Sequence, residues 1–355
     1  MKFLFLIEDC IRRKHPHTYE NYINKGGFSG TDTQIIEMTN HLNIMGHEAH
    51  IIKDSELQYY KDINTIDVFC LSFYTWLNTV INFCRRLNNK AKILLYMQSF
   101  ADTNNLFSLK KNFYIVGVSD YVKKFYHNIN NSYPYKTIYN GINDEIFTRN
   151  DLDYNNKKGN YIFFATYERG GDVCVKIFNK LKSLYNDITL HISSYELNDK
   201  KKIEKNSNSS IITYMSLCKK EIKNLLDKCD YFIYPLVNIN NGSVHHDTFA
   251  CVVLEAMACG VTVLTWDVAC MKSIYGDYIE LIPPPKYPNY HPFDKFGKNN
   301  EMYSEKSLEL FVQKIKYLED NPDIKINKKL KAIDWTLKHN WKDKTKELLN
   351  FLSYS

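Results

Sequence analysis

Residues 246–260 read HDTFACVVLEAMACG and lie between two short apolar runs, Tyr231–Tyr234 and Thr262–Leu264, that are typical of buried parallel strands. The stretch therefore predicts a strand, a loop, a helix that begins near Ala250, and a second strand. The first turn of such a helix presents unpaired backbone N–H groups and the positive end of the helix dipole. Together these groups suit an anion such as a diphosphate.

Two carboxylates flank this helix start. Asp247 precedes it in the loop, and Glu255 lies roughly 7 Å beyond it at a rise of about 1.5 Å per residue. A carboxylate before a diphosphate can hold sugar hydroxyls, and one after it can hold a ribose diol. Their spacing alone is a weak signal, so the LEAMACG segment and the strand context carry the prediction. The expected diphosphate contacts between the two acids are Thr248, Phe249, Ala250 and Cys251.

Strand-like runs alternate with helical patterns on both sides of this stretch. The runs that predict a first parallel sheet are Phe3–Ile7, Ala49–Ile52, Val68–Leu71, Ile93–Tyr96 and Tyr114–Val118. Those that predict a second are Tyr161–Ala165, Thr189–Ser193, Ser210–Thr213, Tyr231–Tyr234, Thr262–Leu264 and Tyr278–Ile282. The polar stretch Thr148–Gly159 separates the two groups and is expected to be a linker. The pattern predicts two α/β domains, residues 1–150 and 151–333.

Composition excludes several classes of protein. The chain has 355 residues, of which 44% are hydrophobic, which is enough for two cores. The net charge of +6 comes from scattered Lys and Arg, so we expect no nucleic-acid partner. No apolar run approaches the ~18 residues of a membrane span. The nine cysteines lack metal-ligand spacing, and the start Met1–Glu8 is too short for a signal peptide, so a cytoplasmic location is expected. The sequence does not indicate an oligomeric state.

A second motif reads YIFFATYERGGD over residues 161–172, a strand that runs into a glycine-containing loop and then a helix over Val173–Leu184. Arg169 in this loop is a candidate functional cation close to the head of that helix. The alternative is a surface arginine beside Asp172 as a helix cap. In the first domain, Gly26 and Gly27 precede a helix and would let the backbone approach donor phosphates, although such glycines also occur in plain turns. The spacing of Thr31 and Gln34 predicts a capping box there.

Taken together, these motifs resemble the family-4 retaining glycosyltransferases of the GT-B fold. The family carries two glutamates eight residues apart, the second of them inside an LEAMAxG helix, and Asp247 replaces the first of them here. The resemblance implies two facing Rossmann-like domains with the active site in the interdomain cleft, and a C-terminal helix, residues 334–355, that crosses back to the first domain. It assigns Arg169 to the leaving diphosphate and Asp247 to the sugar as catalytic residues. Glu255 is assigned to the ribose.

The implied activity is that of a metal-independent retaining hexosyltransferase. It would move a hexose from a nucleotide sugar, GDP-mannose ahead of a UDP-hexose on family usage, to a glycan, glycoconjugate or other hydroxyl acceptor without a cofactor. Where many members place a histidine that touches the sugar, this chain has Gln98, which can hydrogen-bond a sugar or acceptor hydroxyl but cannot act as a base. Asp102 is the nearest carboxylate beyond it. Asp151 and Asp153 match a metal-binding pattern of another fold but fall in the polar linker, which favours solvated residues.

Three other functions are alternatives to a glycosyltransferase. A nicotinamide-dependent oxidoreductase needs its glycine motif directly after the first strand, whereas Gly26 and Gly27 come far downstream. A catalytically degenerate nucleotide-sugar-binding protein shares the expected fold, and so does a nucleotide-sugar epimerase. Donor hydrolysis in the absence of acceptor separates an enzyme from a pure binding protein.

Overall fold

The computed structural model of the chain describes residues 1–7, 16–72, 77–98, 112–124, 133–148, 159–194, 203, 209–237, 246–285, 302 and 304–353. The chain divides into two compact units. Unit 1 comprises Met1–Ile23, Phe28–Asn143 and His339–Ser355, and unit 2 comprises Asn24–Gly27 and Asp144–Lys338.

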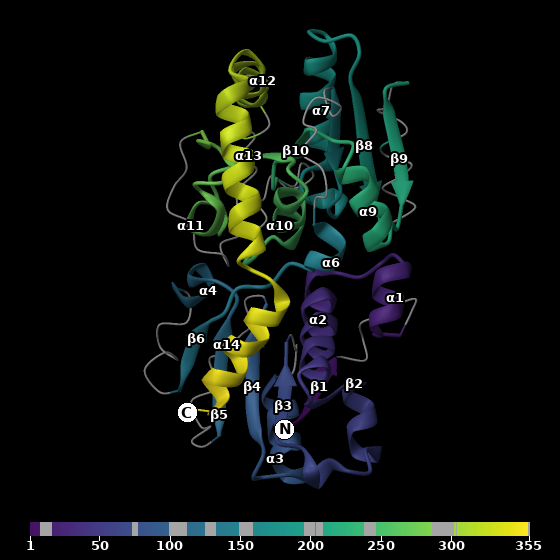
Figure 1. The fold of residues 1–355 in the computed structure, drawn as a ribbon, viewed down its shortest axis with the longest axis vertical. Coiled ribbons are helices and arrows are strands. Elements are labelled where there is room, and N and C mark those ends of the chain that lie inside the picture. Colours follow the sequence, from purple (N-terminus) through teal and green to yellow (C-terminus); the bar gives the residue numbers. More distant parts are fainter. Residues whose placement is uncertain are drawn as a thin grey trace. The chain divides into compact units, whose positions relative to one another are not determined.

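Unit 1 is built on a six-stranded parallel sheet with the order β2-β1-β3-β4-β5-β6 (Figure 1). Its strands are β1 (Lys2–Ile7), β2 (Glu48–Lys53), β3 (Val68–Leu71), β4 (Lys92–Met97), β5 (Phe113–Gly117) and β6 (Tyr135–Thr137). The five strands expected from the sequence are confirmed. The sixth was missed because it is a three-residue edge strand whose side chains are all half-buried, which leaves no apolar run to detect.

The helices of unit 1 are α1 (Tyr19–Asn24), α2 (Gly30–Ile44), α3 (Leu77–Leu87), α4 (Asp120–Lys124) and α14 (Trp341–Ser353), with short 3₁₀ helices at Asp54–Tyr59 and Ile63–Thr65. Helix α14 packs against α2, and both lie over the sheet in Figure 1. The packing buries one face of α14, with Trp341, Leu348 and Leu352 almost fully covered.

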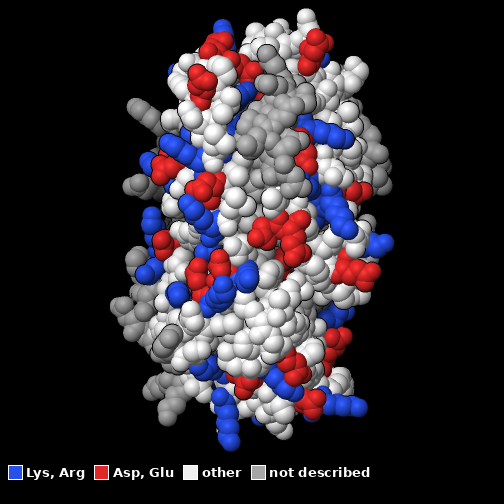
Figure 2. All heavy atoms as spheres, in the orientation of Figure 1, with Lys and Arg blue, Asp and Glu red and all other residues white. Residues whose placement is uncertain are grey.

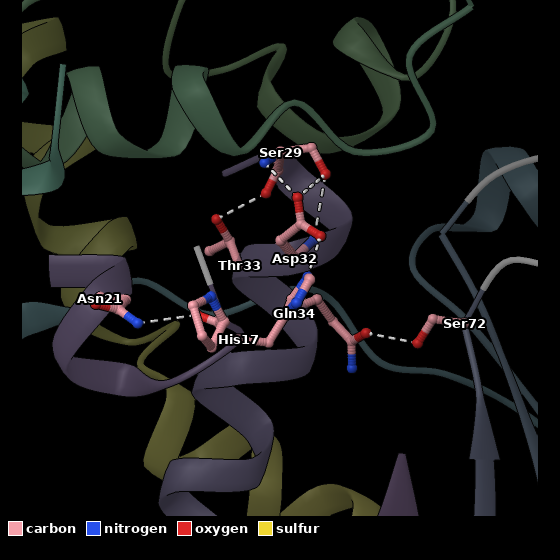
Figure 3. A network of polar contacts seen from close by, with 8 residues as sticks. His17, Asn21, Ser29, Asp32, Thr33, Gln34 and Ser72 are labelled. Atoms are coloured by element: carbon pink, nitrogen blue, oxygen red, sulfur yellow. Dashed lines mark hydrogen bonds and ion pairs between the residues drawn. The ribbon is translucent and has the colours of Figure 1, made fainter. Parts of the chain in front are cut away.

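The capping box of α2 differs from the expected one. Ser29 is the N-cap: its hydroxyl accepts a hydrogen bond from the Asp32 backbone N–H, and the Asp32 carboxylate accepts from the Ser29 N–H at 2.6 Å (Figure 3). The prediction of Thr31 and Gln34 was wrong. Gln34 is completely buried, and its amide oxygen accepts from the hydroxyl of Ser72 at the end of β3, at 3.0 Å. Packing against the sheet therefore decides the role of this glutamine.

Unit 2 is built on a second six-stranded parallel sheet, with the order β12-β11-β10-β7-β8-β9. Its strands are β7 (Asn160–Phe163), β8 (Thr189–Ser194), β9 (Ile211–Met215), β10 (Tyr231–Tyr234), β11 (Thr262–Trp266) and β12 (Glu280–Ile282). Its helices are α6 (Asp144–Phe147), α7 (Gly171–Lys182), α9 (Lys219–Leu226), α10 (Cys251–Ala258), α11 (Met271–Tyr275), α12 (Glu305–Asp320) and α13 (Pro322–Leu337). All six expected strands are confirmed, as is the prediction of two Rossmann-like domains.

The C-terminal segment contains a break that the sequence analysis did not anticipate. Helix α13 ends at Leu337 in unit 2, and α14 begins at Trp341 in unit 1. Asn340 ends the break as an N-cap, since its side-chain oxygen accepts from the Asp343 N–H at 2.9 Å. Ile142 pairs with this turn through hydrogen bonds to His339 and Trp341 at 2.7 and 3.3 Å. One continuous helix from residue 334 is therefore not formed.

Charges of both signs are interspersed on the face of the molecule shown in Figure 2, which agrees with the scattered Lys and Arg of the sequence. Within the part of the chain that the structure describes, no helix combines the length and the apolar character required to cross a bilayer.

Candidate functional site

The site of unit 2 begins at the carboxyl ends of two neighbouring strands. β7 and β10 pair in parallel, so the loops that follow them leave the same edge of the sheet. The loop after β7 contains a 3₁₀ turn, Tyr167–Arg169, and β10 ends at Tyr234. Asp247 lies four residues before the first residue of α10. Parallel pairing thus brings three segments that are far apart in sequence to one place.

Arg169, Tyr234 and Asp247 form a closed ring of polar contacts. The Arg169 guanidinium makes an ion pair with Oδ1 of Asp247 and donates a hydrogen bond to the Tyr234 hydroxyl at 3.3 Å. The Tyr234 hydroxyl donates to Oδ2 of Asp247 at 2.5 Å. The Asp247 side chain is 6% exposed, whereas that of Arg169 is 37% exposed. The arginine therefore connects a buried carboxylate with the open side of the site.

Charge and burial set the protonation states in this ring. The Asp247 carboxylate is the main cause that raises the pKa of Arg169 above its ordinary value, and the neighbouring Tyr234 adds to it. Burial is the main cause that raises the pKa of Tyr234 well above its ordinary value, and Asp247 adds to it. The ring therefore contains a guanidinium cation and an un-ionised phenol, whose hydroxyl donates a hydrogen bond to Asp247.

The loop that carries Arg169 depends on a glycine. Gly170 adopts φ +113°, and an added Cβ would lie 3.1 Å from Pro235 and 3.2 Å from the backbone nitrogen of Leu236. Only glycine adopts this backbone conformation without strain. Leu236, directly opposite, is buried and has φ +57°, which is unusual for a side chain of this kind. The backbone at Gly170 therefore lies close to the segment Pro235–Leu236 that follows β10, next to the hydrogen bond between Arg169 and Tyr234.

Helix α10 begins beside this ring. Its N-cap residue, Ala250, has no side-chain oxygen to accept from the first turn, and its carbonyl accepts from the Tyr275 hydroxyl at 3.2 Å. Thr248 and Phe249 are buried, with the Phe249 ring edge-on to Tyr275, and Cys251 is half-buried. Tyr275 thus anchors the loop that leads into the helix, so the backbone around the helix start has a defined position.

Glu255 lies in the middle of α10 and is 3% exposed. Its Oε1 makes an ion pair with Lys219, the first residue of α9. Its Oε2 is buried and has no hydrogen-bond partner among the described residues. A buried carboxylate oxygen without a donor is costly, so this atom marks a place where a ligand hydroxyl or a water fits. The assignment of Glu255 to the donor site stays a prediction. The sequence contains no signal for Lys219 beside it or for Tyr234 in the ring, because neither belongs to a short motif.

Gly26 and Gly27 were expected in the first domain, but the segment Asn24–Gly27 belongs to unit 2. Gly26 lies against the backbone of Ser216, where an added Cβ would come within 1.5 Å of the carbonyl oxygen. Gly27 adopts φ +93°. Both positions therefore exclude a side chain, Gly26 because of contact and Gly27 because of conformation.

Gln98 follows β4 in unit 1 and forms two reciprocal side-chain hydrogen bonds with Asn140, each 3.0 Å long. The amide is thus engaged with a second amide. Asp102 lies outside the described residues, as do Asp151 and Asp153. Within the described ranges, no cluster of three or more His, Cys, Asp and Glu side chains is arranged to hold a metal ion.

Unit 1 contains one further pair that the sequence reasoning did not assign. Nε2 of His17 lies 2.8 Å from Oδ1 of Asp32, and the two side chains are 7% and 3% exposed (Figure 3). The other oxygen of Asp32 accepts from both the N–H and the hydroxyl of Ser29 at 2.6 Å. A carboxylate fixed in this way orients the imidazole, which is the arrangement of a general base. The sequence gives no signal for this pair, because the two residues are 15 positions apart and belong to no shared motif.

Comparisons with known proteins indicate the family of one segment and the fold of the chain. Residues 160–287, which include Arg169, Asp247 and Glu255, match the family model of glycosyl transferases group 1. No curated protein matches the sequence. A glycosyltransferase from Rickettsia africae has a TM-score of 0.70 at 14% identity, with 99% of this chain and 97% of that chain covered.

Two other solved structures share the fold. The sucrose-phosphate synthase of Thermosynechococcus elongatus has a TM-score of 0.69 at 10% identity and covers 98% of this chain and 97% of that one. HepE of Anabaena, solved with UDP and glucose, has a TM-score of 0.67 at 12% identity, and each chain covers 100% of the other. The fold is GT-B. With the family match over unit 2, it supports a glycosyltransferase of the GT-B type.

Proposed function

We propose that this chain is a retaining hexosyltransferase that moves a hexose from a nucleoside-diphosphate sugar to a hydroxyl group of a glycan or another acceptor. The observation that carries the proposal is the ring of Arg169, Tyr234 and Asp247 at the carboxyl ends of β7 and β10, beside the start of α10. It combines a cation, an anion and a helix N-terminus in the motif positions that the family match covers.

Each group has a role in this proposal. Arg169 uses one nitrogen for Asp247 and Tyr234, and a guanidinium has further N–H groups that fit phosphate oxygens. Together with the backbone N–H groups near Ala250 it would stabilise the leaving diphosphate. Asp247 accepts from sugar hydroxyls with its remaining lone pairs. Oε2 of Glu255 accepts from the ribose.

The donor is the first matter to test. HepE was solved in complex with UDP-glucose, so UDP-glucose is the first candidate donor, and GDP-mannose, which the sequence resemblance favours, is the second. Calorimetric titration with both nucleotide sugars, and with UDP-N-acetylglucosamine, identifies the base and the sugar. Absence of binding by all three would contradict the proposed function.

Glu255→Gln should weaken binding of the preferred donor by about 1.5 to 3 kcal/mol, the range for losing hydrogen bonds to a charged group. That loss corresponds to roughly a 10- to 150-fold rise in Kd. Glu305→Gln, at a surface ion pair with Lys180, is the matched control and should bind as the wild type does. Equal affinity of all three proteins would remove Glu255 from the ribose role.

A catalytically degenerate binding protein is the second candidate, because Arg169 and Asp247 are engaged with each other in the structure. Incubation of the preferred donor without acceptor separates the two. Slow release of free hexose and nucleoside diphosphate supports a transferase. An intact donor after prolonged incubation supports a binding protein, and conversion to an epimeric nucleotide sugar supports an epimerase.

We expect the transferred sugar to keep its anomeric configuration. In this mechanism the departing phosphate oxygen takes the acceptor's proton on the same face, so no protein base is required. An early proton-NMR time course with UDP-glucose should show an α-linked first product, and His17→Gln should leave the rate within a few-fold. A β-linked product, with a His17→Gln variant that binds donor but is inactive, would instead make His17 and Asp32 the base of an inverting enzyme.

Chelators should leave turnover unchanged. The proposed site stabilises the diphosphate with Arg169 and a helix N-terminus, which need no metal. The test is the rate of donor turnover after dialysis against EDTA, compared with the same protein supplied with magnesium or manganese. Loss of turnover in EDTA that either ion restores would contradict this expectation and direct attention to Asp151 and Asp153.

A further inference from the structure

Lys219 occupies an unusual place for a lysine. It is the first residue of α9, where the positive end of the helix dipole disfavours a cation. Its side chain is only 11% exposed and reaches Glu255 on α10, and its ammonium lies 5.9 Å from the centre of the Phe147 ring at the end of α6. Three elements of unit 2 thus converge on one ammonium group.

The ion pair uses only half of the Glu255 carboxylate. Oε1 faces Lys219, while Oε2 is buried without a hydrogen-bond partner among the described residues. A buried polar atom without a hydrogen-bond partner is costly. The contact with Lys219 therefore fixes one oxygen and leaves the other as a buried acceptor that no described residue uses.

Helix α13 packs on α10, and three of its lysines form ion pairs with other carboxylates. Lys325 and Lys329 pair with Asp230, and Lys328 pairs with Glu280. The α6 contribution is the Phe147 ring. Among the described residues, Lys219 is the cation that contacts the Glu255 carboxylate.

We propose that Lys219 is a positioning residue of the donor site, which engages Oε1 of Glu255 and thereby holds Oε2 toward the ribose of the nucleotide sugar. This inference rests on the proposed function, because it assigns the ribose to Oε2. Lys219 acts through Glu255, so its contribution to donor binding exists only while Glu255 is present. This property separates positioning from direct contact with the donor.

The test is calorimetric titration of UDP-glucose, or of whichever nucleotide sugar the wild type binds, into Lys219→Met. Without the ammonium, the Glu255 side chain loses the contact that fixes its Oε1, so Oε2 is no longer held toward the diol. We expect affinity at pH 7 to fall by about 10- to 100-fold. Lys223→Met is the matched control: it removes a charge from the same helix at a pair with Asp227, and should bind as the wild type does.

Two further readouts exclude a merely structural effect. Lys219→Arg keeps a cation beside Oε1 of Glu255, so it should bind the donor more tightly than Lys219→Met does. In the double variant Lys219→Met with Glu255→Gln, the lysine change should add no further loss.

Additive losses in the double variant, or a Lys219→Arg variant that binds no more tightly than Lys219→Met, would overturn the positioning role and make Lys219 a direct ligand contact or a structural residue. Wild-type affinity in Lys219→Met would also overturn it. A wild type that binds no nucleotide sugar at all would instead refute the proposed function. Thermal unfolding identifies any variant that fails to fold. If Lys219→Met is one of them, Lys219→Gln, which also removes the cation, takes its place in the same titrations.

Discussion

Arg169→Ala is expected to lower turnover by about 10²- to 10³-fold, the range for removing one donor that stabilises charge in a transition state. The guanidinium is the partly exposed cation of the ring, and negative charge on the departing phosphate is greatest as the glycosidic bond opens. Donor affinity should fall less than turnover, because the diphosphate carries less of that charge in the ground state. Steady-state kinetics, combined with calorimetric donor affinity, measures the two effects separately.

Two comparisons sharpen this prediction. Arg169→Lys keeps the charge but loses the fork of N–H groups, so it should recover only part of the turnover. Lys180→Ala, which removes a cation at a surface pair with Glu305, should turn over at the wild-type rate. A variant Arg169→Ala whose donor affinity collapses while turnover survives would place the arginine in donor binding and not in the chemical step.

The second large effect concerns stability. Asp230 precedes β10 and is 2% exposed. It forms an ion pair with Lys329 and a second with Lys325 at 2.9 Å, both on α13, and Lys325 continues to Glu319 on α12 at 2.7 Å. This network ties two helices to the start of a central strand. Removal of one partner leaves the others charged and buried.

Asp230→Asn should therefore lower the free energy of unfolding by about 3 to 5 kcal/mol, the range for breaking a buried pair. Asp334→Asn is the matched control, since its pair with Lys338 is 68% exposed on both sides and is worth at most about 1 kcal/mol. Denaturant unfolding followed by tryptophan fluorescence measures both variants. Equal losses in the two would show that the buried network adds nothing beyond a surface pair.

The same network predicts a pH dependence. Burial by itself would raise the pKa of Asp230, but Lys329 and then Lys325 outweigh it, and the net pKa is lowered. A lowered carboxyl pKa stabilises the folded state above the unfolded pKa of about 3.9, and this contribution is lost as pH falls through the folded value. The wild type should thus lose more stability in acid than Asp230→Asn does.

The sequence by itself determined the two Rossmann-like sheets. A parallel strand that is buried on both faces has a short run of apolar residues in its sequence. The runs Val68–Leu71 and Tyr231–Tyr234 have the same bounds as the observed strands β3 and β10. Local sequence also singled out Arg169, Asp247 and Glu255 as candidate site residues, because each belongs to a motif that the strand–loop–helix order makes recognisable. Their roles stay predictions.

The tertiary structure decided which side chains meet. Tyr234, Lys219 and the pair of His17 and Asp32 carry no local signal, since their partners lie 13, 36 and 15 residues away and contact depends on how strands and helices pack. The N-cap of α2 is Ser29 and not the predicted Thr31. Gln34, the expected partner in the capping box, is buried and accepts a hydrogen bond from Ser72 instead. Periodicity records which face of an element is apolar. It does not record which polar group on one element meets a polar group on another, because that follows from three-dimensional packing.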